Sequence, residues 1–234
     1  MEEDIMEIHS GSQDTYEKVG TFAGEELPFS KYLRWDRMGL LAILADFYLN
    51  YSKGNILEIG AGESTVYFSW LARKYNRQAF FCDIQQSIYV NALTVDGYFQ
   101  GEHIIIREGE DKTNIKSNFP NTIYIGDSTK MFKDINLPSL AVALIDGGHM
   151  YEQVKKDFWN IFPLIEETGA IFLHDLNPPN EEYHNENLCG TGFRLRKELE
   201  ENKDLDVFTF VRSAINVGLT MVRVRNKNRK YFQA

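Results

Sequence analysis

Five acidic side chains lie within or just after apolar runs of this chain. Acids at such positions can bind a ligand or a cation. They are Glu58, Asp83, Asp127, Asp146 and Asp175. Aspartate also favours strand ends and helix caps for structural reasons, which would explain any one of them. Five acids at one edge of a sheet are harder to explain in that way, so we expect a site there.

The turn after the first apolar run has the composition of a nucleotide-binding turn. Asn55–Gly62 reads N-I-L-E-I-G-A-G, with two glycines one residue apart. A backbone without Cβ atoms can turn sharply at the carboxyl end of a buried strand and let a ligand lie against it. Asp83 follows Gly60 by 23 residues, close to the roughly 20 residues at which such units place a ribose-binding acid. The sequence therefore predicts an adenosine-containing cofactor.

Asp146 and Asp175 end two runs that we expect to be adjacent central strands, 29 residues apart. Their carboxylates could converge on one hard divalent cation, which prefers oxygen ligands. Asn177, or Glu63 from the first turn, could supply a third oxygen. The alternative is that Asp146 only organises the turn after it and that Asp175 only caps.

His149 stands three residues beyond Asp146, at the expected start of a helix, where its imidazole can face the same cleft. A histidine whose pKa is near neutrality suits the removal of a proton from a substrate hydroxyl. A lone histidine is more often structural, and that interpretation stays open. His174 precedes Asp175, and strand alternation predicts that it points to the opposite face of the sheet.

The apolar pattern also predicts the helices that must position these side chains. Helices are expected over 35–50, from 64 or 65 to about 75, and over 88–99, 151–167 and 193–202. Ser64 or Thr65 is expected to cap the second of them. Gly169 is expected to stop the fourth.

Short apolar runs predict strands, and nearly continuous ones predict strands buried on both faces of a sheet. The runs are the one that begins at Asn55 and those at 79–82, 103–106, 122–125, 140–145, 170–173, 207–211 and 217–224. Strands that alternate with helices predict an α/β fold with a doubly wound, mostly parallel sheet, whose ligands gather outside the carboxyl ends of the strands. Residues 1–30 are expected to be an irregular lead-in.

Composition narrows the classes of function. The net charge of -9 over 234 residues disfavours a nucleic-acid binder, which needs a surplus of basic side chains. No signal peptide is evident, and the apolar stretch at 38–48 is interrupted by Asp46 and shorter than the roughly 20 residues of a membrane span. Two cysteines without framework spacing are typical of a reducing compartment, so we expect a cytoplasmic protein. The oligomeric state is open, and a homo-oligomer is compatible with the sequence.

Together these motifs resemble the class I S-adenosylmethionine-dependent methyltransferases. The motifs are E-I-G-A-G at 58–62, Asp83, G-D-S at 126–128 and D-G-G-H-M-Y-E at 146–152, and the resemblance covers about 55–177. It is greatest to the group whose fourth strand ends in D-G-x-H-x-Y-E. In one departure, Ser64 stands where the usual turn has its third glycine. A dinucleotide G-x-G-x-x-G pattern fits less well still, because its third glycine would fall at Thr65.

The resemblance implies a Rossmann-like, seven-stranded sheet with helices on both faces and an antiparallel last strand. It implies a lead-in and cap helix over 1–52 and a methyltransferase domain over 53–234. It further implies that a Mg²⁺ ion held at Asp146, Asp175 and Asn177 orients a substrate hydroxyl, with His149 as general base. The cofactor residues that we expect on this basis are Glu58, Gly60, Gly62, Asp83, Asp127, Ser128 and Asp146.

The expected activity is transfer of a methyl group to a hydroxyl of a small molecule, such as a sugar or a secondary metabolite. The loop over 177–192 is the expected lid or specificity element. One alternative is an NAD(P)-binding oxidoreductase, since Tyr151 and Lys155 have the Tyr-x-x-x-Lys spacing, although they follow the wrong strand. Another is a noncatalytic cofactor-binding protein.

Overall fold

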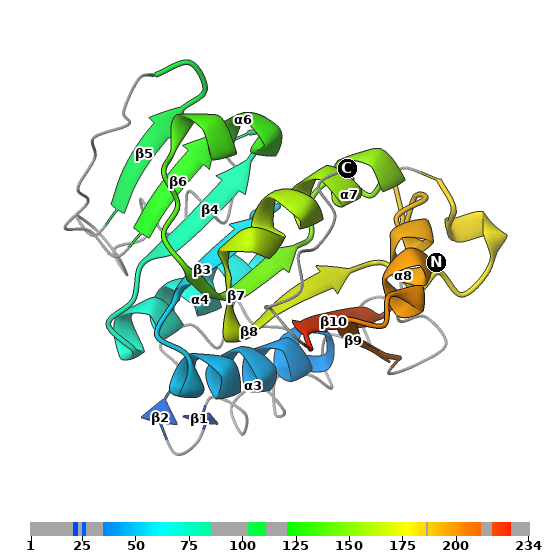
Figure 1. Cartoon of the computed structure of the whole chain (residues 1–234). Coiled ribbons are helices and arrows are strands. Elements are labelled where there is room, and N and C mark those ends of the chain that lie inside the picture. The colour runs from blue at the N-terminus through cyan, green and yellow to red at the C-terminus, as the bar shows by residue number, and fades with distance from the viewer. Residues whose placement is uncertain are drawn as a thin grey trace, which may run out of the picture.

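The computed structural model describes residues 21–22, 25–26, 35–85, 103–110, 121–185, 187–211 and 217–225 (Figure 1). Of the expected lead-in over 1–30, only the two short strands β1 (Thr21–Phe22) and β2 (Glu25–Glu26) are described. The predicted helix over 88–99 lies outside the described residues.

An eight-stranded sheet forms the centre of the fold, in the order β5-β6-β4-β3-β7-β8-β10-β9. Its strands are β3 (Asn55–Ile59), β4 (Ala79–Asp83), β5 (His103–Arg107), β6 (Asn121–Ile125), β7 (Leu140–Ile145), β8 (Ile165–His174), β9 (Leu205–Phe210) and β10 (Leu219–Val224). The last strand, β10, runs antiparallel to both of its neighbours, and the other pairs are parallel. The doubly wound, mostly parallel sheet is therefore confirmed.

The apolar runs predicted all eight strands of this sheet, whereas the family resemblance implied seven. β5 pairs in parallel with β6 and adds an edge strand at that side of the sheet. At the centre, β3 pairs with β4 on one side and with β7 on the other, so the order of the chain reverses between them. Ligands of open α/β sheets bind at such a switch point, outside the carboxyl ends of the strands.

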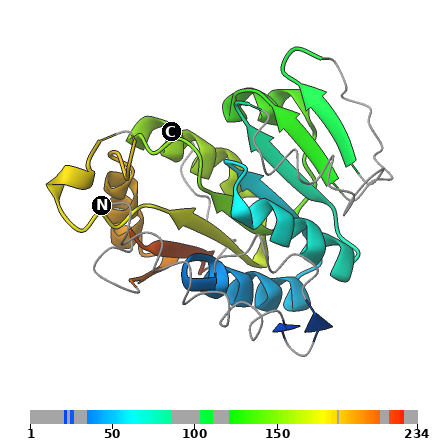
Figure 2. The same ribbon diagram turned by 180° about the vertical axis from the view of Figure 1, so that it is seen from behind.

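Helices cover both faces of the sheet, as Figures 1 and 2 show. α3 (Trp35–Tyr51) and α4 (Glu63–Lys74) share one apolar core with Ile56 and Leu144. α6 (Ser128–Asp134), α7 (Tyr151–Ile161) and α8 (Phe193–Glu201) share the other with Leu57 and Ile145. Neighbouring residues of one strand thus enter opposite cores, which explains why the strand sequences are continuously apolar rather than alternating.

The boundary between α7 and β8 differs from the prediction. α7 ends at Ile161 rather than at 167, and a short 3-10 turn, η2 (Phe162–Leu164), leads directly into β8. Pro163 lies in this turn, where its missing N–H and fixed φ oppose a longer α-helix. Gly169 lies inside β8, where a Cβ atom would come within 2.7 Å of the carbonyl oxygen of Ala141. This glycine therefore allows close strand packing and does not stop a helix.

α3 packs into the core of the sheet. Ala45 and Leu49 are buried, and the hydroxyl of Tyr48 contacts the sulfur of Met221 at 3.4 Å. The division of the chain at residue 52 stays a prediction. Among the described residues, no helix combines the length and the apolar character that a membrane crossing requires.

Candidate active site

The two positions of the turn after β3 are occupied by glycine for different structural reasons. Gly60 has a φ of +91°, and a Cβ atom there would lie 2.6 Å from the backbone nitrogen of Gly147. Its N–H donates to the carbonyl of Cys82 at 2.8 Å, so the turn is tied to β4 as well. Among the described residues, a Cβ atom at Gly62 would meet only the hydroxyl of Ser64, at 3.9 Å. Gly60 is therefore required by the protein's own packing, whereas no described residue packs closely against the Cβ position of Gly62.

Glu58 lies beneath this turn and is completely buried. The hydroxyls of Ser64 and Thr65 donate to its two carboxylate oxygens, the Thr65 contact measuring 2.6 Å. Burial raises the pKa of Glu58 to about 8, although the two hydroxyl hydrogen bonds oppose the shift. Any role of Glu58 toward a cofactor is exerted through the shape of the turn.

Neither Ser64 nor Thr65 is the N-cap of α4, although Thr65 takes part in capping from the third helical position. The helix begins at Glu63, and Gly62 occupies the N-cap position. The N–H of Gly62 donates to the Thr65 hydroxyl at 2.8 Å. Both hydroxyl groups also bind a buried acid six or seven residues earlier, a use that the local sequence pattern does not reveal.

Asp83, at the end of β4, reaches toward the glycine turn. One of its carboxylate oxygens accepts from the N–H of Ala61 at 3.0 Å, and the other accepts from the N–H of Gln85 at 3.1 Å. The side chain is partly exposed. This is the place that the sequence predicted for a ribose-binding acid, and the contact itself stays a prediction.

Asp127 and Ser128 begin α6 in different ways. Asp127 is the N-cap and accepts from the N–H and the hydroxyl of Thr129, both at 2.8 Å, which lowers its pKa. Ser128 turns into the protein, where its hydroxyl donates to the fully buried Asp157 at 2.7 Å and accepts from Gln153 at 2.8 Å. The Ser128 hydroxyl therefore has no proton left to donate to adenine, and it could contact the base only as an acceptor.

Asp146, His149 and Asp175 come together at the ends of β7 and β8. Their ligand atoms all lie within 4.8 Å of one another. β7 and β8 pair in parallel, with Ile145 opposite Leu173, which brings the two acids to the same edge. The Nε2 atom of His149 is 3.2 Å from a carboxylate oxygen of Asp175. The structure thus brings together the two predicted acids and the predicted general base.

His174 also belongs to this cluster, and the prediction that it points to the opposite face was wrong. Its Nδ1 atom lies 3.1 Å from Asp146 and 2.9 Å from Asp175, as ion pairs without the alignment of hydrogen bonds. Burial lowers the pKa of His174, but the two carboxylates outweigh it and raise the pKa to about 10. Asp175 lies beyond the strand with a φ of +60°, so strand alternation does not extend across this pair.

Asn177 already has hydrogen-bond partners outside the cluster. Its side-chain oxygen accepts a hydrogen bond from Arg196 on α8, and its N–H donates to the carbonyl of Val217 at 2.8 Å. As a metal ligand it would have to give up the bond to Arg196. His149 is therefore a better-placed third side chain, while ligation by Asn177 or by Glu63 stays a prediction.

The Tyr151 and Lys155 pair serves a different purpose from the one that an oxidoreductase would need. The amine of Lys155 donates to the Tyr151 hydroxyl at 2.6 Å, and that hydroxyl donates to Glu198. Lys155 also contacts Glu198 at 3.1 Å. These bonds join α7 to α8, so the Tyr-x-x-x-Lys spacing of this pair has a structural role.

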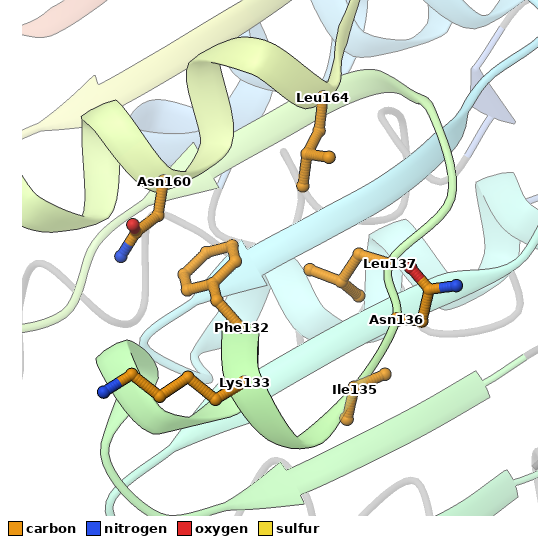
Figure 3. Close-up of a pocket in the computed structure, with 7 residues that line it drawn as sticks. All are labelled: Phe132, Lys133, Ile135, Asn136, Leu137, Asn160 and Leu164. Atoms are coloured by element: carbon orange, nitrogen blue, oxygen red, sulfur yellow. The ribbon is translucent and has the colours of Figure 1, made fainter. Parts of the chain in front are cut away.

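The structure also has a cavity of about 420 Å³ (Figure 3). It is bounded by the end of α6, the segment leading into β7, and the end of α7 with η2. Its lining residues are Phe132, Lys133, Ile135, Asn136, Leu137, Asn160 and Leu164. None of the predicted site residues borders it.

Solved structures of low sequence identity share this fold. An O-methyltransferase from Bacillus cereus, solved with S-adenosylhomocysteine, is 15% identical over 92% of this chain and 89% of its own, with a TM-score of 0.53. The Podospora anserina methyltransferase PaMTH1, also bound to S-adenosylhomocysteine, is 15% identical over 86% and 83%, with a TM-score of 0.55. MycE from the mycinamycin biosynthetic pathway, solved with Mg, S-adenosylhomocysteine and mycinamycin VI, is 15% identical over 86% and 55%, with a TM-score of 0.53.

Sequence comparison places the chain in a family. No curated protein sequence matches it at a significant level. A family model described as a methyltransferase domain matches residues 57–176, which is 120 of the 234 residues. Because that segment contains the glycine turn, Asp83 and the acids after β7 and β8, the chain belongs to the methyltransferase-domain family and is an S-adenosylmethionine-dependent methyltransferase.

Proposed function

We propose that this enzyme methylates a hydroxyl of a small molecule, with a divalent cation held by Asp146 and Asp175 and with His149 as the general base. The observation that carries the proposal is the convergence of these three side chains within 4.8 Å, at the edge of the sheet that also bears the glycine turn. An acid pair and an imidazole at one point can hold a cation and accept a proton.

The chain's own groups fit the cofactor. S-adenosylmethionine supplies an electrophilic methyl group on a cationic sulfonium. Gly62 leaves space beside the turn, and Asp83 lies within hydrogen-bonding distance of the backbone of that turn. We assign the methionine and ribose parts to Gly60, Gly62 and Asp83, and the adenine to the start of α6.

The metal-binding chemistry rests on the carboxylates. Two carboxylates suit Mg²⁺, which is bound by oxygen atoms and keeps several waters. A bound cation would polarise and orient the acceptor hydroxyl. If His149 served as a third ligand, the site would instead suit a transition metal that accepts nitrogen. We favour Mg²⁺ on Asp146 and Asp175, because this leaves the imidazole to accept the proton. MycE, which was solved with Mg, has a similar fold.

The contact with Asp175 holds His149 in an orientation in which it can act as the proton acceptor. Asp175 contacts Nε2 at 3.2 Å and limits the rotation of the ring. Methyl transfer from a sulfonium needs alignment of donor and acceptor and removal of the hydroxyl proton, rather than covalent help. The side chain is partly exposed, so a substrate can reach it.

A small hydroxylated acceptor agrees with the names of structurally similar proteins. One is an O-methyltransferase, and another was solved with mycinamycin VI. We expect the loop over 177–192, which follows β8, to select the acceptor. Sugars and secondary metabolites are the classes that we propose.

Calorimetry combined with a methyl-transfer assay tests the proposal. S-adenosylmethionine and S-adenosylhomocysteine should bind the purified protein, whereas NAD should not. Turnover on a panel of sugars, catechols and macrolides should require added Mg²⁺ and stop with EDTA. Binding of NAD alone would overturn the activity, and turnover that is indifferent to EDTA would overturn the metal.

A further inference from the structure

We propose that Gly190, Thr191 and Gly192 form a backbone brace that positions His149 for catalysis. The inference rests on the proposed function, because it takes His149 as the proton acceptor. It assigns a task to the end of the loop after β8, a segment that the sequence suggested only as a lid.

Two hydrogen bonds join the brace to the turn that carries His149. The N–H of Gly192 donates to the carbonyl oxygen of His149 at 2.9 Å. The N–H of Tyr151 donates to the hydroxyl of Thr191 at 3.0 Å. Both ends of the three-residue segment from His149 to Tyr151 are thus fixed by two consecutive residues of a distant loop.

The glycines let the brace pack directly on the His149 backbone. Gly190 has a φ of +54°, and a Cβ atom there would lie 2.8 Å from the carbonyl carbon of His149 and 3.1 Å from its Cβ. A Cβ atom on Gly192 would lie 2.6 Å from the side chain of Leu176. Larger residues would push the His149 turn away.

The His149 turn needs an external support. Gly147 and Gly148 precede it, and glycine adds backbone freedom. Met150 occupies the N-cap position of α7 and provides no side-chain hydrogen bond to the helix. The first N–H groups of a helix lack partners within the helix. Thr191 supplies one from outside, in the way that an N-cap threonine would.

The brace is itself held in place. It leads directly into α8, and the Tyr151 hydroxyl and the Lys155 amine, both on α7, bind Glu198 on α8. The loop that carries the brace follows Asp175 in the sequence, and its last residues bond to the His149 backbone. One segment therefore links Asp175 to His149, whose side chains are 3.2 Å apart.

Substitution of Thr191 tests the brace. Thr191→Val keeps the shape and removes the acceptor, whereas Thr191→Ser keeps the hydroxyl. We expect the valine variant to lower kcat by about 10-fold to 10²-fold, the scale for a misplaced catalytic group. It should also speed amide hydrogen exchange at Tyr151 while leaving the Kd for S-adenosylmethionine unchanged. The serine variant should restore all three properties.

Thr168→Val is the matched control, because its hydroxyl bonds to Ser52 at 2.8 Å at the opposite end of β8. It should leave kcat unchanged. If Thr191→Val retains kcat, if serine does not rescue it, or if the control loses as much activity, the brace is refuted.

Failure of the proposed function would look different. The wild-type protein would methylate no acceptor, or His149→Ala would retain full activity. The brace would then be judged by the ring-proton NMR resonances of His149 in the full chain. Thr191→Val should shift them and Thr191→Ser should not, and unchanged resonances in the valine variant would overturn the brace.

Discussion

The imidazole of His149 lies 3.2 Å from the carboxylate of Asp175, and the two residues come from the loops that follow two adjacent parallel strands. The contact fixes which way the ring faces. It also places a potential proton acceptor beside a potential metal ligand, with Asp146 completing the group. The following predictions test this arrangement and the turn beside it.

Replacement of His149 by alanine should reduce kcat by roughly 10²-fold to 10⁴-fold, the usual contribution of a general base. Binding of S-adenosylmethionine should persist, since the expected cofactor contacts other than Asp146 lie in or next to β3, β4 and α6. Single-turnover kinetics and calorimetry separate the two effects. His103→Ala, on the edge strand β5, is the control for losing a histidine. A normal rate for His149→Ala would return this residue to a structural role.

Asp146→Asn should abolish Mg²⁺-dependent turnover while leaving cofactor affinity nearly intact. The amide keeps the size of the side chain but lacks the charge that a hard cation requires. Turnover as a function of added Mg²⁺ is the measurement. Asp206→Asn removes an aspartate that pairs with Arg225 on the surface and should behave as wild type. Equal Mg²⁺ dependence in both variants would show that Asp146 is not a ligand.

Much of the site could be predicted from the sequence, because the carboxyl ends of parallel strands meet at one edge. Asp83, Asp146 and Asp175 each follow an apolar run, and pairing of β4, β3, β7 and β8 brings those runs side by side. The glycine turn and His149 were placed correctly for the same reason. The doubly wound, mostly parallel sheet was the expected consequence of alternating strands and helices.

The errors have local or long-range physical causes. His174 and Asp175 face the same site because the backbone leaves the strand at Asp175 with a positive φ, which no hydrophobic pattern encodes. Ser64 and Thr65 look like N-caps in sequence, but Gly62 is the N-cap, and both hydroxyl groups donate to a buried acid. The contacts of Thr191 with the His149 turn join residues 40 apart, and spacing rules do not reach that far.

Glu58→Gln should change the pH dependence of stability. Burial raises the pKa of Glu58 from 4.5 to about 8, so the folded protein favours the neutral form. Its contribution to stability is fully present below about pH 4.5 and is lost as the pH rises through about 8. The glutamine variant cannot ionise and should gain stability relative to wild type over that interval, by at most about 5 kcal/mol.

Urea unfolding at several pH values measures the difference. Glu166→Gln, at a partly exposed acid near the start of β8, controls for the loss of one negative charge. A difference between Glu58→Gln and wild type that stays constant from acid to alkaline pH would contradict the proposed burial effect.

Alanine at the two glycines of the turn should separate folding from cofactor binding. Gly60→Ala forces a side chain into the backbone of Asp146 and Gly147 at a positive φ, so it should destabilise the fold by about 1–3 kcal/mol or more. Among the described residues, the alanine of Gly62→Ala meets only the Ser64 hydroxyl at 3.9 Å, so this variant should lose only about 1 kcal/mol or less, the scale for alanine at an N-cap.

The added methyl at Gly62 projects into the space that we assign to S-adenosylmethionine, so the Kd for the cofactor should rise although the fold is intact. Denaturant unfolding and calorimetry on the same two variants give both quantities. If Gly62→Ala binds the cofactor as tightly as wild type, the ligand lies elsewhere along the sheet edge. If Gly60→Ala is as stable as wild type, the close approach of the β3 and β7 turns has been overestimated.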